Sequence, residues 1–275
     1  MRTIPCVIWL SAIVALSAAP SGGAELKPVS LDLGGGVKMA LAPIPAGEFM
    51  MGSPEREKEG QPAERPVHKV RISKPFHMGV HEVTNAQYRR FRAGHHSQYL
   101  DGDDQPALWV SWHDADAFCQ WLSAKTGRTV RLATEAQWEY ACRAGTDTRF
   151  YTGDKARLKD SGDLVKAGWY GGNARGQSKP VGKKAPNAFG LYDMHGNVWE
   201  FCSDHFRLNA YAKMKTPVDP QGPADGWYTN RVMRGGAFDV PARDCRSGRR
   251  GLMRDAYART GFGMRVVIES VADTE

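Results

Sequence analysis

Residues that favour turns interrupt this chain so often that neither a long helix nor a long strand fits most of it. The 275 residues include 30 glycines and 16 prolines, and after Gly145 short apolar runs alternate with loops rich in Gly, Pro and Asn. The chain also has 8 Trp, 9 Tyr and 10 Phe, whose rings can pack between the turns. We therefore expect a loop-rich α+β fold rather than a helical bundle, with no helix after Gly145.

Three helices are predicted before that point, each by a capping box. In this motif a hydroxyl side chain and an acid or amide three residues later satisfy the first free amides of the helix. The three pairs are Thr84 with Gln87, Ser111 with Asp114, and Thr134 with Gln137.

Short strands are expected between and after these helices, where apolar residues alternate or run together before a turn. Hydrophobic residues make up 41% of the chain, enough for a core, and no flexible linker divides it, so one domain is the simpler assignment. The predicted strands cover residues 39–44, 48–53, 67–73, 198–202, 232–238 and 264–268.

The N-terminus resembles a secretory signal. Arg2 precedes an apolar run from Ile4 to Ala19, which is too short to span a bilayer comfortably, and the small residues Gly22 and Ala24 follow at the spacing of a cleavage site. We therefore expect a signal peptide over residues 1–24, an N-terminal leader over 25–39 and the folded domain over 40–270. The mature protein is expected to be periplasmic or secreted, without stable membrane insertion, and monomeric.

The net charge of +7 would ordinarily suggest nucleic acid as a partner. Because the protein is expected to be exported, the charge instead favours an anionic small molecule, an acidic protein partner or the membrane surface.

A series of short motifs occurs along residues 40 to 268. The motifs are IPAGEF (44–49), MGS (51–53), EVTNAQY (82–88), RLATEAQWEY (131–140), NAFGLYDM (187–194), GNVWE (196–200), RGG (234–236) and CRS (245–247). In this order they resemble the formylglycine-generating enzymes, also called sulfatase-modifying factors. The resemblance implies a C-type lectin-like variant with little regular secondary structure.

The resemblance also implies a copper site that this sequence lacks. In the family, two cysteines five residues apart hold Cu(I), which activates O₂ while a substrate cysteine joins the copper, and a serine follows the two glycines. Here Cys245 matches the second cysteine, but Val240 occupies the first position and Ala237 replaces the serine. Because valine cannot ligate copper, bound copper and ordinary formylglycine formation are not expected.

Two interpretations of Cys245 remain open. It forms a disulfide with Cys202, as exported proteins commonly do, or it is a reactive thiol and a catalytic candidate. His205 is a second catalytic candidate, as an acid or base beside Cys245. Cys119 and Cys142 either pair with each other or stay buried and reduced.

The family also carries structural calcium, a hard ion that prefers oxygen ligands. The resemblance points to Asn197, Val198 and Glu200 as ligands of one site and to Asn173 as part of a second. A hydrogen-bonded cluster without a metal is the alternative for Asn197 and Glu200.

Arginines are dense in the segment that lines the pocket in relatives. We expect Arg246, Arg249 and Arg250 to bind a carboxylate or phosphate of the substrate, although some of these arginines would pair with buried carboxylates.

The leading function is an exported maturation or accessory factor that resembles formylglycine-generating enzymes. It would act on a periplasmic protein or a siderophore-type small molecule by chemistry that needs no copper pair. The alternatives are a formylglycine-generating oxidase of sulfatase cysteines and a non-enzymatic lectin-like binding module, so whether the protein is an enzyme stays open. The scaffold alone does not choose among them.

Overall fold

The computed structural model describes residues 26–154, 162–214, 217–223 and 229–269. The expected signal peptide, residues 1–24, lies outside these ranges. None of the helices in them is long and apolar enough to cross a bilayer.

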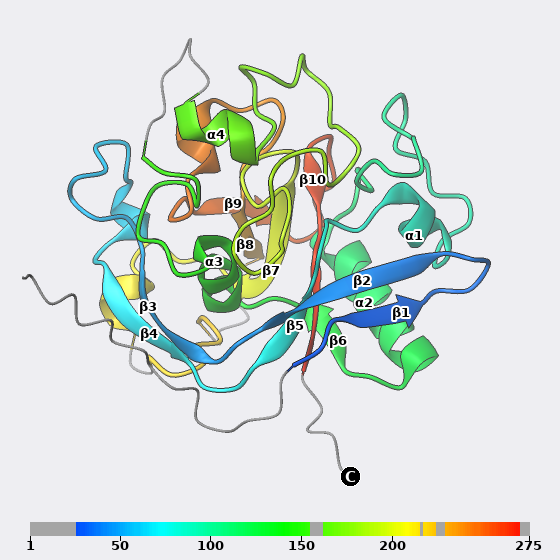
Figure 1. Cartoon of the computed structure of the whole chain (residues 1–275), viewed down its shortest axis with the longest axis horizontal. Coiled ribbons are helices and arrows are strands. Elements are labelled where there is room, and N and C mark those ends of the chain that lie inside the picture. The colour runs from blue at the N-terminus through cyan, green and yellow to red at the C-terminus, as the bar shows by residue number, and fades with distance from the viewer. Residues whose placement is uncertain (1–25, 155–161, 215–216, 224–228, 270–275) are drawn as a thin grey trace, which may run out of the picture.

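The largest sheet has five strands in the order β1-β2-β5-β11-β6, and every neighbouring pair is antiparallel. The C-terminal strand β11 therefore lies between two strands from the first half of the chain, which closes the domain (Figure 1). The sheet also reaches into the segment predicted as a leader, because β1 pairs with β2. The strands are β1 (Val29–Asp32), β2 (Lys38–Ile44), β5 (Phe76–Gly79), β6 (Val130–Leu132) and β11 (Val266–Glu269).

A second sheet has four strands in the order β10-β7-β8-β9, with β9 at a free edge. Strands β10 and β7 are parallel, and the other pairs are antiparallel. A separate hairpin joins two further strands. The strands of the second sheet are β7 (Trp199–His205), β8 (Asn230–Arg234), β9 (Gly251–Arg254) and β10 (Phe262–Gly263), and those of the hairpin are β3 (Gly47–Met51) and β4 (His68–Ile72).

The three predicted capping boxes are all present, and each opens a helix at the predicted residue. The prediction of no helix after Gly145 is wrong, because α4 forms there. Tertiary packing stabilises this helix, with Leu164 and Ala167 buried. The helices are α1 (Asn85–Arg89), α2 (Trp112–Thr126), α3 (Glu135–Arg143) and α4 (Gly162–Ala167).

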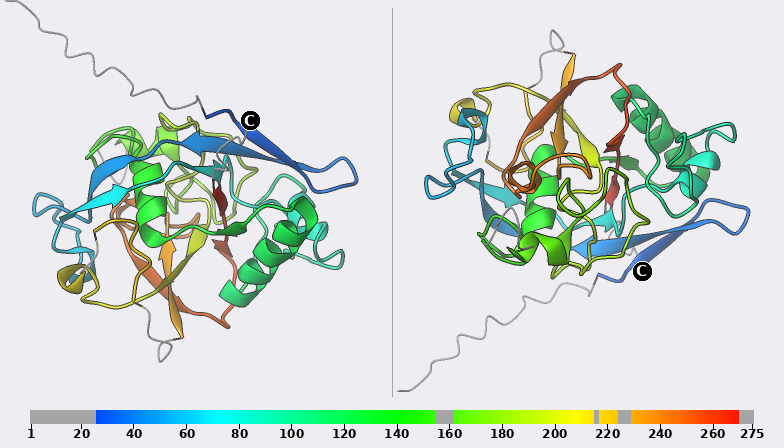
Figure 2. Two further views of the ribbon diagram at one scale, coloured as in Figure 1. Left: turned by 90° about the horizontal axis from the view of Figure 1, so that it is seen from below. Right: turned by 90° about the horizontal axis from the view of Figure 1, so that it is seen from above.

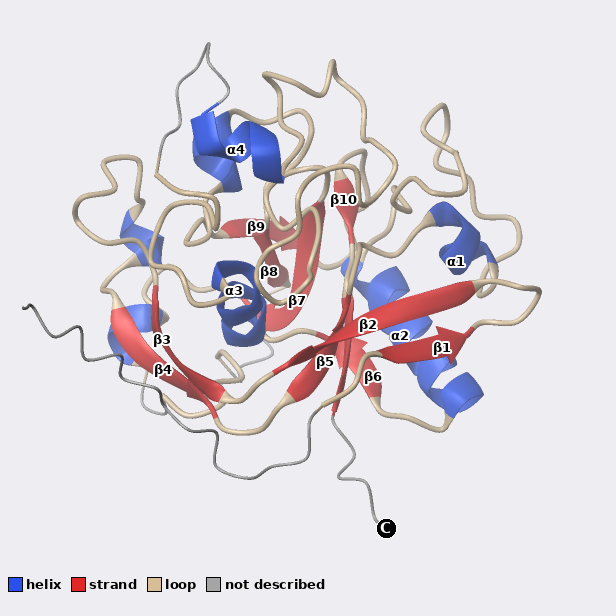
Figure 3. Cartoon of the chain, viewed as in Figure 1, coloured by secondary structure: helices blue, strands red, loops and turns tan. Residues whose placement is uncertain are grey.

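Two hydrophobic clusters form most of the core. One packs α2 against the five-stranded sheet, and the other surrounds α3, which contacts β3, β4, β7 and β8 (Figure 2). Long loops make up much of the remaining chain, as Figure 3 shows. The described parts of the loops contain three short 3-10 helices: η1 (Pro62–Glu64), η2 (Tyr211–Lys213) and η3 (Ala242–Cys245).

Candidate functional site

A groove of about 390 Å³ lies beside β9 and brings together much of the segment that the sequence singled out. Trp199, at the start of β7, lies on its wall, Val240 and Asp239 come from the loop after β8, and Arg249 and Arg259 come from either side of β9. The groove therefore combines an aromatic ring, an aliphatic side chain and charged groups from segments that are separate in sequence.

Two glycines after β8 shape this region. Both Gly235 and Gly236 have positive φ, and a Cβ on Gly236 would lie 2.6 Å from the Cys245 thiol and 2.8 Å from the Asp244 carbonyl oxygen. Only glycine fits there, so the chain turns back directly over Cys245. Ala237, the next residue, is fully buried.

Cys245 is not placed as an accessible nucleophile. It has no exposed surface, and burial raises the pKa of its thiol above the usual value. It packs with Phe150, Leu164 and Val240 in a small hydrophobic cluster. A thiolate, the reactive form, is strongly disfavoured in such surroundings.

The expected disulfide between Cys202 and Cys245 is not formed. Cys119, Cys142, Cys202 and Cys245 are all buried free thiols. The physical reason is that Cys202, on β7, packs in the cluster around α3, whereas Cys245 belongs to the cluster beneath α4.

The histidine that contacts Cys245 is His195, not the predicted His205. The sequence pattern did not indicate His195. The His195 Nδ1–H donates to the Cys245 carbonyl at 2.8 Å, and its Nε2 accepts from the Tyr151 amide at 3.0 Å. Burial lowers the pKa of His195 to about 3, so this imidazole is neutral and holds two loops together. His205 lies at the end of β7 and does not line the groove, so the arrangement does not support a catalytic pair of His205 and Cys245.

The prediction that Arg246 binds substrate is corrected, because its guanidinium is only 1% exposed. It lies between two carboxylates, with Nη1 at 2.9 Å from an oxygen of Glu57 and of Glu64. It also donates to the Ser53 hydroxyl at 2.8 Å. Arg246 therefore fastens the 53–64 loop to η3.

Arg250 is also buried, although its segment borders the groove. Both oxygens of Glu135 accept from it, and Nη1 donates to the Ala63 carbonyl at 2.8 Å. Arg249 differs, because its side chain is 16% exposed and lies on the groove wall, 6.0 Å from the Trp199 ring centroid. It donates to Asp244 at 2.8 Å. Of the three predicted substrate-binding arginines, only Arg249 presents its side chain to the groove.

The residues predicted to bind calcium are engaged in hydrogen bonds. The Asn197 Oδ1 accepts from the Lys179 amide at 2.8 Å, and the Asn173 Oδ1 accepts from the Tyr170 amide at 2.8 Å. The Glu200 carboxylate accepts two bonds from Arg265 Nε, one from Arg265 Nη2 and one from Trp138 Nε1. Val198 donates its amide to Glu82. Among the described residues, no three His, Cys, Asp or Glu side chains converge on a metal position.

One neighbouring carboxylate has an oxygen without a hydrogen-bond partner among the described residues. Asp193 is 1% exposed, and while its Oδ2 accepts from the Gly182 amide, its Oδ1 has no hydrogen-bond partner among the described residues. Burial raises its pKa to about 6, and burial with the charges of Asp193 and Glu200 raises the pKa of Glu82. The cluster holds the three carboxylates of Glu82, Asp193 and Glu200, with Arg265 and Lys184 as the cations that act on it. A calcium ion here would need main-chain oxygens as well as Asp193, a residue that the sequence analysis missed.

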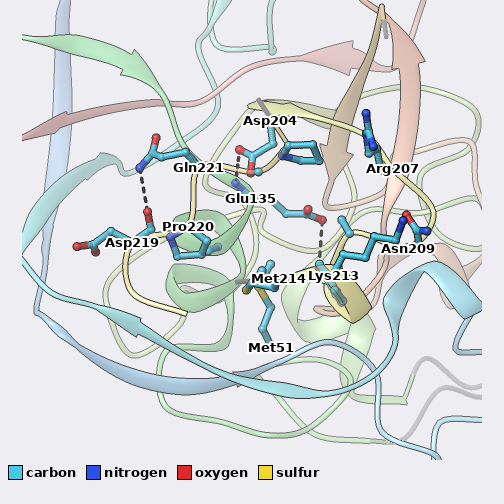
Figure 4. A pocket seen from close by; sticks show the side chains of 15 residues that line it. Met51, Glu135, Asp204, Arg207, Asn209, Lys213, Met214, Asp219, Pro220 and Gln221 are labelled. Carbon is cyan, nitrogen blue, oxygen red and sulfur yellow. Dashed lines mark hydrogen bonds between the residues drawn. The ribbon is translucent and has the colours of Figure 1, made fainter. Parts of the chain in front are cut away.

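A second cavity of about 410 Å³ lies at the N-terminus of α3 (Figure 4). Met51 and Met214 provide apolar surface, and Asp204 lies at the buried wall, where its Oδ2 accepts from the Glu135 amide at 2.8 Å. Burial, with the charge of Glu135, raises the pKa of Asp204 to about 7. Because Asp204 satisfies the first amide of α3, its position is explained by the fold, and the groove remains the stronger candidate.

Comparison with known proteins shows the family of this chain. The family model described as "Sulfatase-modifying factor enzyme 1-like domain" matches residues 38–270. The chain belongs to the sulfatase-modifying factor family. The formylglycine-generating enzyme of Streptomyces coelicolor is 32% identical over 256 residues, covering 71% of this chain and 77% of that enzyme.

Solved structures show the same fold. PvdO from Pseudomonas aeruginosa superposes with a TM-score of 0.76 at 28% identity, covering 89% of this chain and 100% of that one. Treponema denticola variable protein 1 has a TM-score of 0.79 at 24% identity, covering 88% and 99%, and shows the fold alone. The predicted α+β fold, the C-type lectin-like variant of the sulfatase-modifying factor type, is confirmed.

Compared with the pattern of the sulfatase-modifying factor family, this chain differs at the position of the first copper ligand. The position that the family resemblance assigns to the first copper ligand holds Val240, which lies in the groove, and Cys245 beneath it is inaccessible. The groove is lined by Trp199, Arg249 and Arg259, whereas one cysteine of the pair that the family resemblance assigns to copper is replaced by Val240.

Proposed function

We propose that this protein is an exported accessory or maturation factor that binds an extended segment of a partner protein in the groove beside β9. The observation that carries the proposal is the replacement of a thiol by Val240 in a groove that still presents Trp199, Arg249 and Arg259. An aromatic ring, an aliphatic surface and arginines are features of recognition sites. Binding, followed by chemistry that does not involve a copper pair, is the function they support.

The charges of the groove favour an acidic or otherwise anionic partner. Arg259 is 54% exposed, and Asp239, its partner, is 3.6 Å away at the surface. A surface pair of this kind contributes little, so a ligand carboxylate can replace Asp239 at small cost. A siderophore-type anionic small molecule is the second substrate class that such a groove would admit.

Photo-crosslinking in the native host tests the proposal. A photoreactive phenylalanine analogue at Leu208, on the lip of the groove and 65% exposed, is expected to capture a defined exported protein. The same analogue at Tyr99, which is 71% exposed and does not line the groove, is the control. Equal products from both positions would contradict the proposal, and a small-molecule adduct at position 208 alone would select the second substrate class.

Copper chemistry is tested separately. Purified protein supplied with Cu(I) and O₂ is expected to leave a Cys-x-Pro-x-Arg peptide unchanged. Copper-dependent conversion of the peptide cysteine to the aldehyde would favour the oxidase alternative and overturn the proposed function.

A further inference from the structure

We propose that the partner segment joins the four-stranded sheet as an additional antiparallel strand along the free edge of β9. The inference rests on the proposed function and specifies how the groove recognises an extended chain. Strand β9 pairs with β8 on one side and, among the described residues, is the last strand of the sheet on the other. An unpaired edge offers main-chain amides and carbonyls to another chain.

The pairing of β9 with β8 decides which β9 residues bond to β8 and which direct their main-chain groups to the free edge. The Asp255 amide donates to the Thr229 carbonyl at 2.7 Å, just beyond the paired residues of β8 and β9. In an antiparallel ladder the residues that bond to a given neighbour alternate. Met253 and Gly251 therefore bond to β8, whereas Leu252 and Arg254 direct their main-chain groups to the free edge.

These outward groups are available for pairing. None of the described residues outside β8 hydrogen-bonds the main-chain amide or carbonyl of Leu252, or the amide of Arg254. The Arg254 carbonyl accepts from the Tyr257 amide at 3.0 Å. Two amides and one carbonyl can thus bond to a short extended segment.

The groove runs past this edge. Successive side chains of a strand point to opposite faces of its sheet. Gly251, Leu252 and Met253 nevertheless all line the groove, so the groove is in contact with both faces at the edge of β9. The Trp199 ring occupies the space beside Gly251, where a Cβ would lie 2.8 Å from a ring carbon. A chain lying along the edge is therefore also within the groove.

The side chains of β9 specify the chemistry of the partner. Leu252 is 46% exposed, and Arg254, two residues later on the same face, is exposed as well. Residues directly opposite on paired strands contact each other. An antiparallel partner would place an apolar residue opposite Leu252 and, two positions earlier in its own sequence, an acidic residue opposite Arg254. The sequence class expected is Glu-x-Leu within an extended segment.

The test uses a labelled probe peptide, Ac-Ser-Thr-Glu-Thr-Leu-Thr-Ser-NH₂, and fluorescence anisotropy with the purified protein. Leu252→Pro removes the outward amide without removing a bond to β8, and proline is tolerated at an edge position of this kind. Leu252→Ala, which keeps the amide, is the matched control. We expect Leu252→Pro to weaken binding about tenfold relative to Leu252→Ala, with similar melting temperatures for the two variants.

Peptide variants test the same bonds from the other side. N-methylation of the peptide leucine removes the amide that would donate to the Leu252 carbonyl, and is expected to weaken binding about tenfold. N-methylation of the preceding threonine, whose amide would point away from β9, is the control. Exchange of the peptide glutamate for lysine should weaken binding, because it places a positive charge opposite Arg254.

Failure of the strand addition is distinguishable from failure of the proposed function. Arg259→Glu reverses an exposed charge of the groove and should weaken binding of the acidic peptide. If Arg259→Glu weakens binding but Leu252→Pro matches Leu252→Ala, the peptide occupies the groove without pairing to β9, and the strand-addition inference is overturned. Binding that no variant alters would overturn both, and absence of binding would overturn the inferred Glu-x-Leu class.

Discussion

Arg250 and Glu135 form a bidentate ion pair inside the protein. The Arg250 Nε donates to Oε1 at 2.6 Å and its Nη2 to Oε2 at 2.9 Å, while the Arg250 side chain has no exposed surface. Arg234 shares the same carboxylate from β8, so the pair connects the start of α3 to the second sheet. An arginine held in this way stabilises the fold and is not free to bind a substrate.

Alanine substitutions of adjacent arginines should therefore have different effects. Arg250→Ala leaves a buried carboxylate with one fewer partner, and we expect the free energy of unfolding to fall by about 3–5 kcal/mol. Arg249→Ala, at the groove wall, removes a partly exposed side chain and should cost less stability than Arg250→Ala, but should weaken binding of an acidic peptide. Urea unfolding and peptide binding, measured on the same variants, would contradict this assignment if the two variants lost equal stability.

The contrast between these arginines shows where prediction from sequence stops. Capping boxes predicted three helices because their partners are three residues apart, and the family motifs identified Val240 and Ala237. The partners of Arg246 and Arg250 are separated from them by more than a hundred residues, so no local pattern revealed which arginines are buried. Helix α4 was missed for a similar reason, because its burial comes from tertiary contacts.

Four of the five cysteines, Cys119, Cys142, Cys202 and Cys245, are described by the structure and should react only when the protein unfolds; Cys6 lies in the expected signal peptide. Burial raises the pKa of each thiol, to about 12 for Cys142. A thiol reagent such as dithionitrobenzoate is therefore expected to label none of them in the native protein and all four in denaturant, without a reducing agent. Two unreactive cysteines in denaturant would instead indicate a disulfide and would contradict the free thiols of the structure.

Asp204 should make stability depend on pH in a defined direction. Its pKa is raised to about 7 in the folded protein, above the ordinary value near 3.8. The stability associated with the protonated carboxyl is therefore full below the unfolded pKa and is lost as the pH rises through 7. The buried neutral His195, with a pKa of about 3, has the opposite effect, because stability falls as the pH drops below the usual histidine range.

The effect of Asp204 can be separated from that of His195 by comparing the free energy of unfolding of an Asp204 variant with that of the original protein. Asp204→Asn keeps an oxygen that can accept from the Glu135 amide but cannot ionise. Its free energy of unfolding, relative to the original protein, should rise by on the order of 3 kcal/mol between pH 4.5 and pH 7.5. Parallel profiles for the two proteins in urea unfolding would show that Asp204 ionises normally.

Calcium should stabilise the protein through Asp193. The Asp193 Oδ1, which has no hydrogen-bond partner among the described residues, lies in a buried cluster. Burial and the charges of Asp193 and Glu200 raise the pKa of Glu82 there, so a bound cation would relieve repulsion between the carboxylates. Calcium at about a hundred times its dissociation constant would add about 2.7 kcal/mol to the free energy of unfolding. For a domain of this size that is a rise of roughly 5–10 °C in melting temperature.

Chelator melting curves on a pair of variants provide the test. Asp193→Asn should lose the response to calcium, and in chelator it should be at least as stable as the original protein, because a buried charge has been removed. Asp147→Asn changes a carboxylate that is 83% exposed and should keep the full response. If metal analysis finds no calcium in the purified protein, and chelator leaves all three melting temperatures unchanged, the cluster is held by hydrogen bonds and Arg265 without a metal.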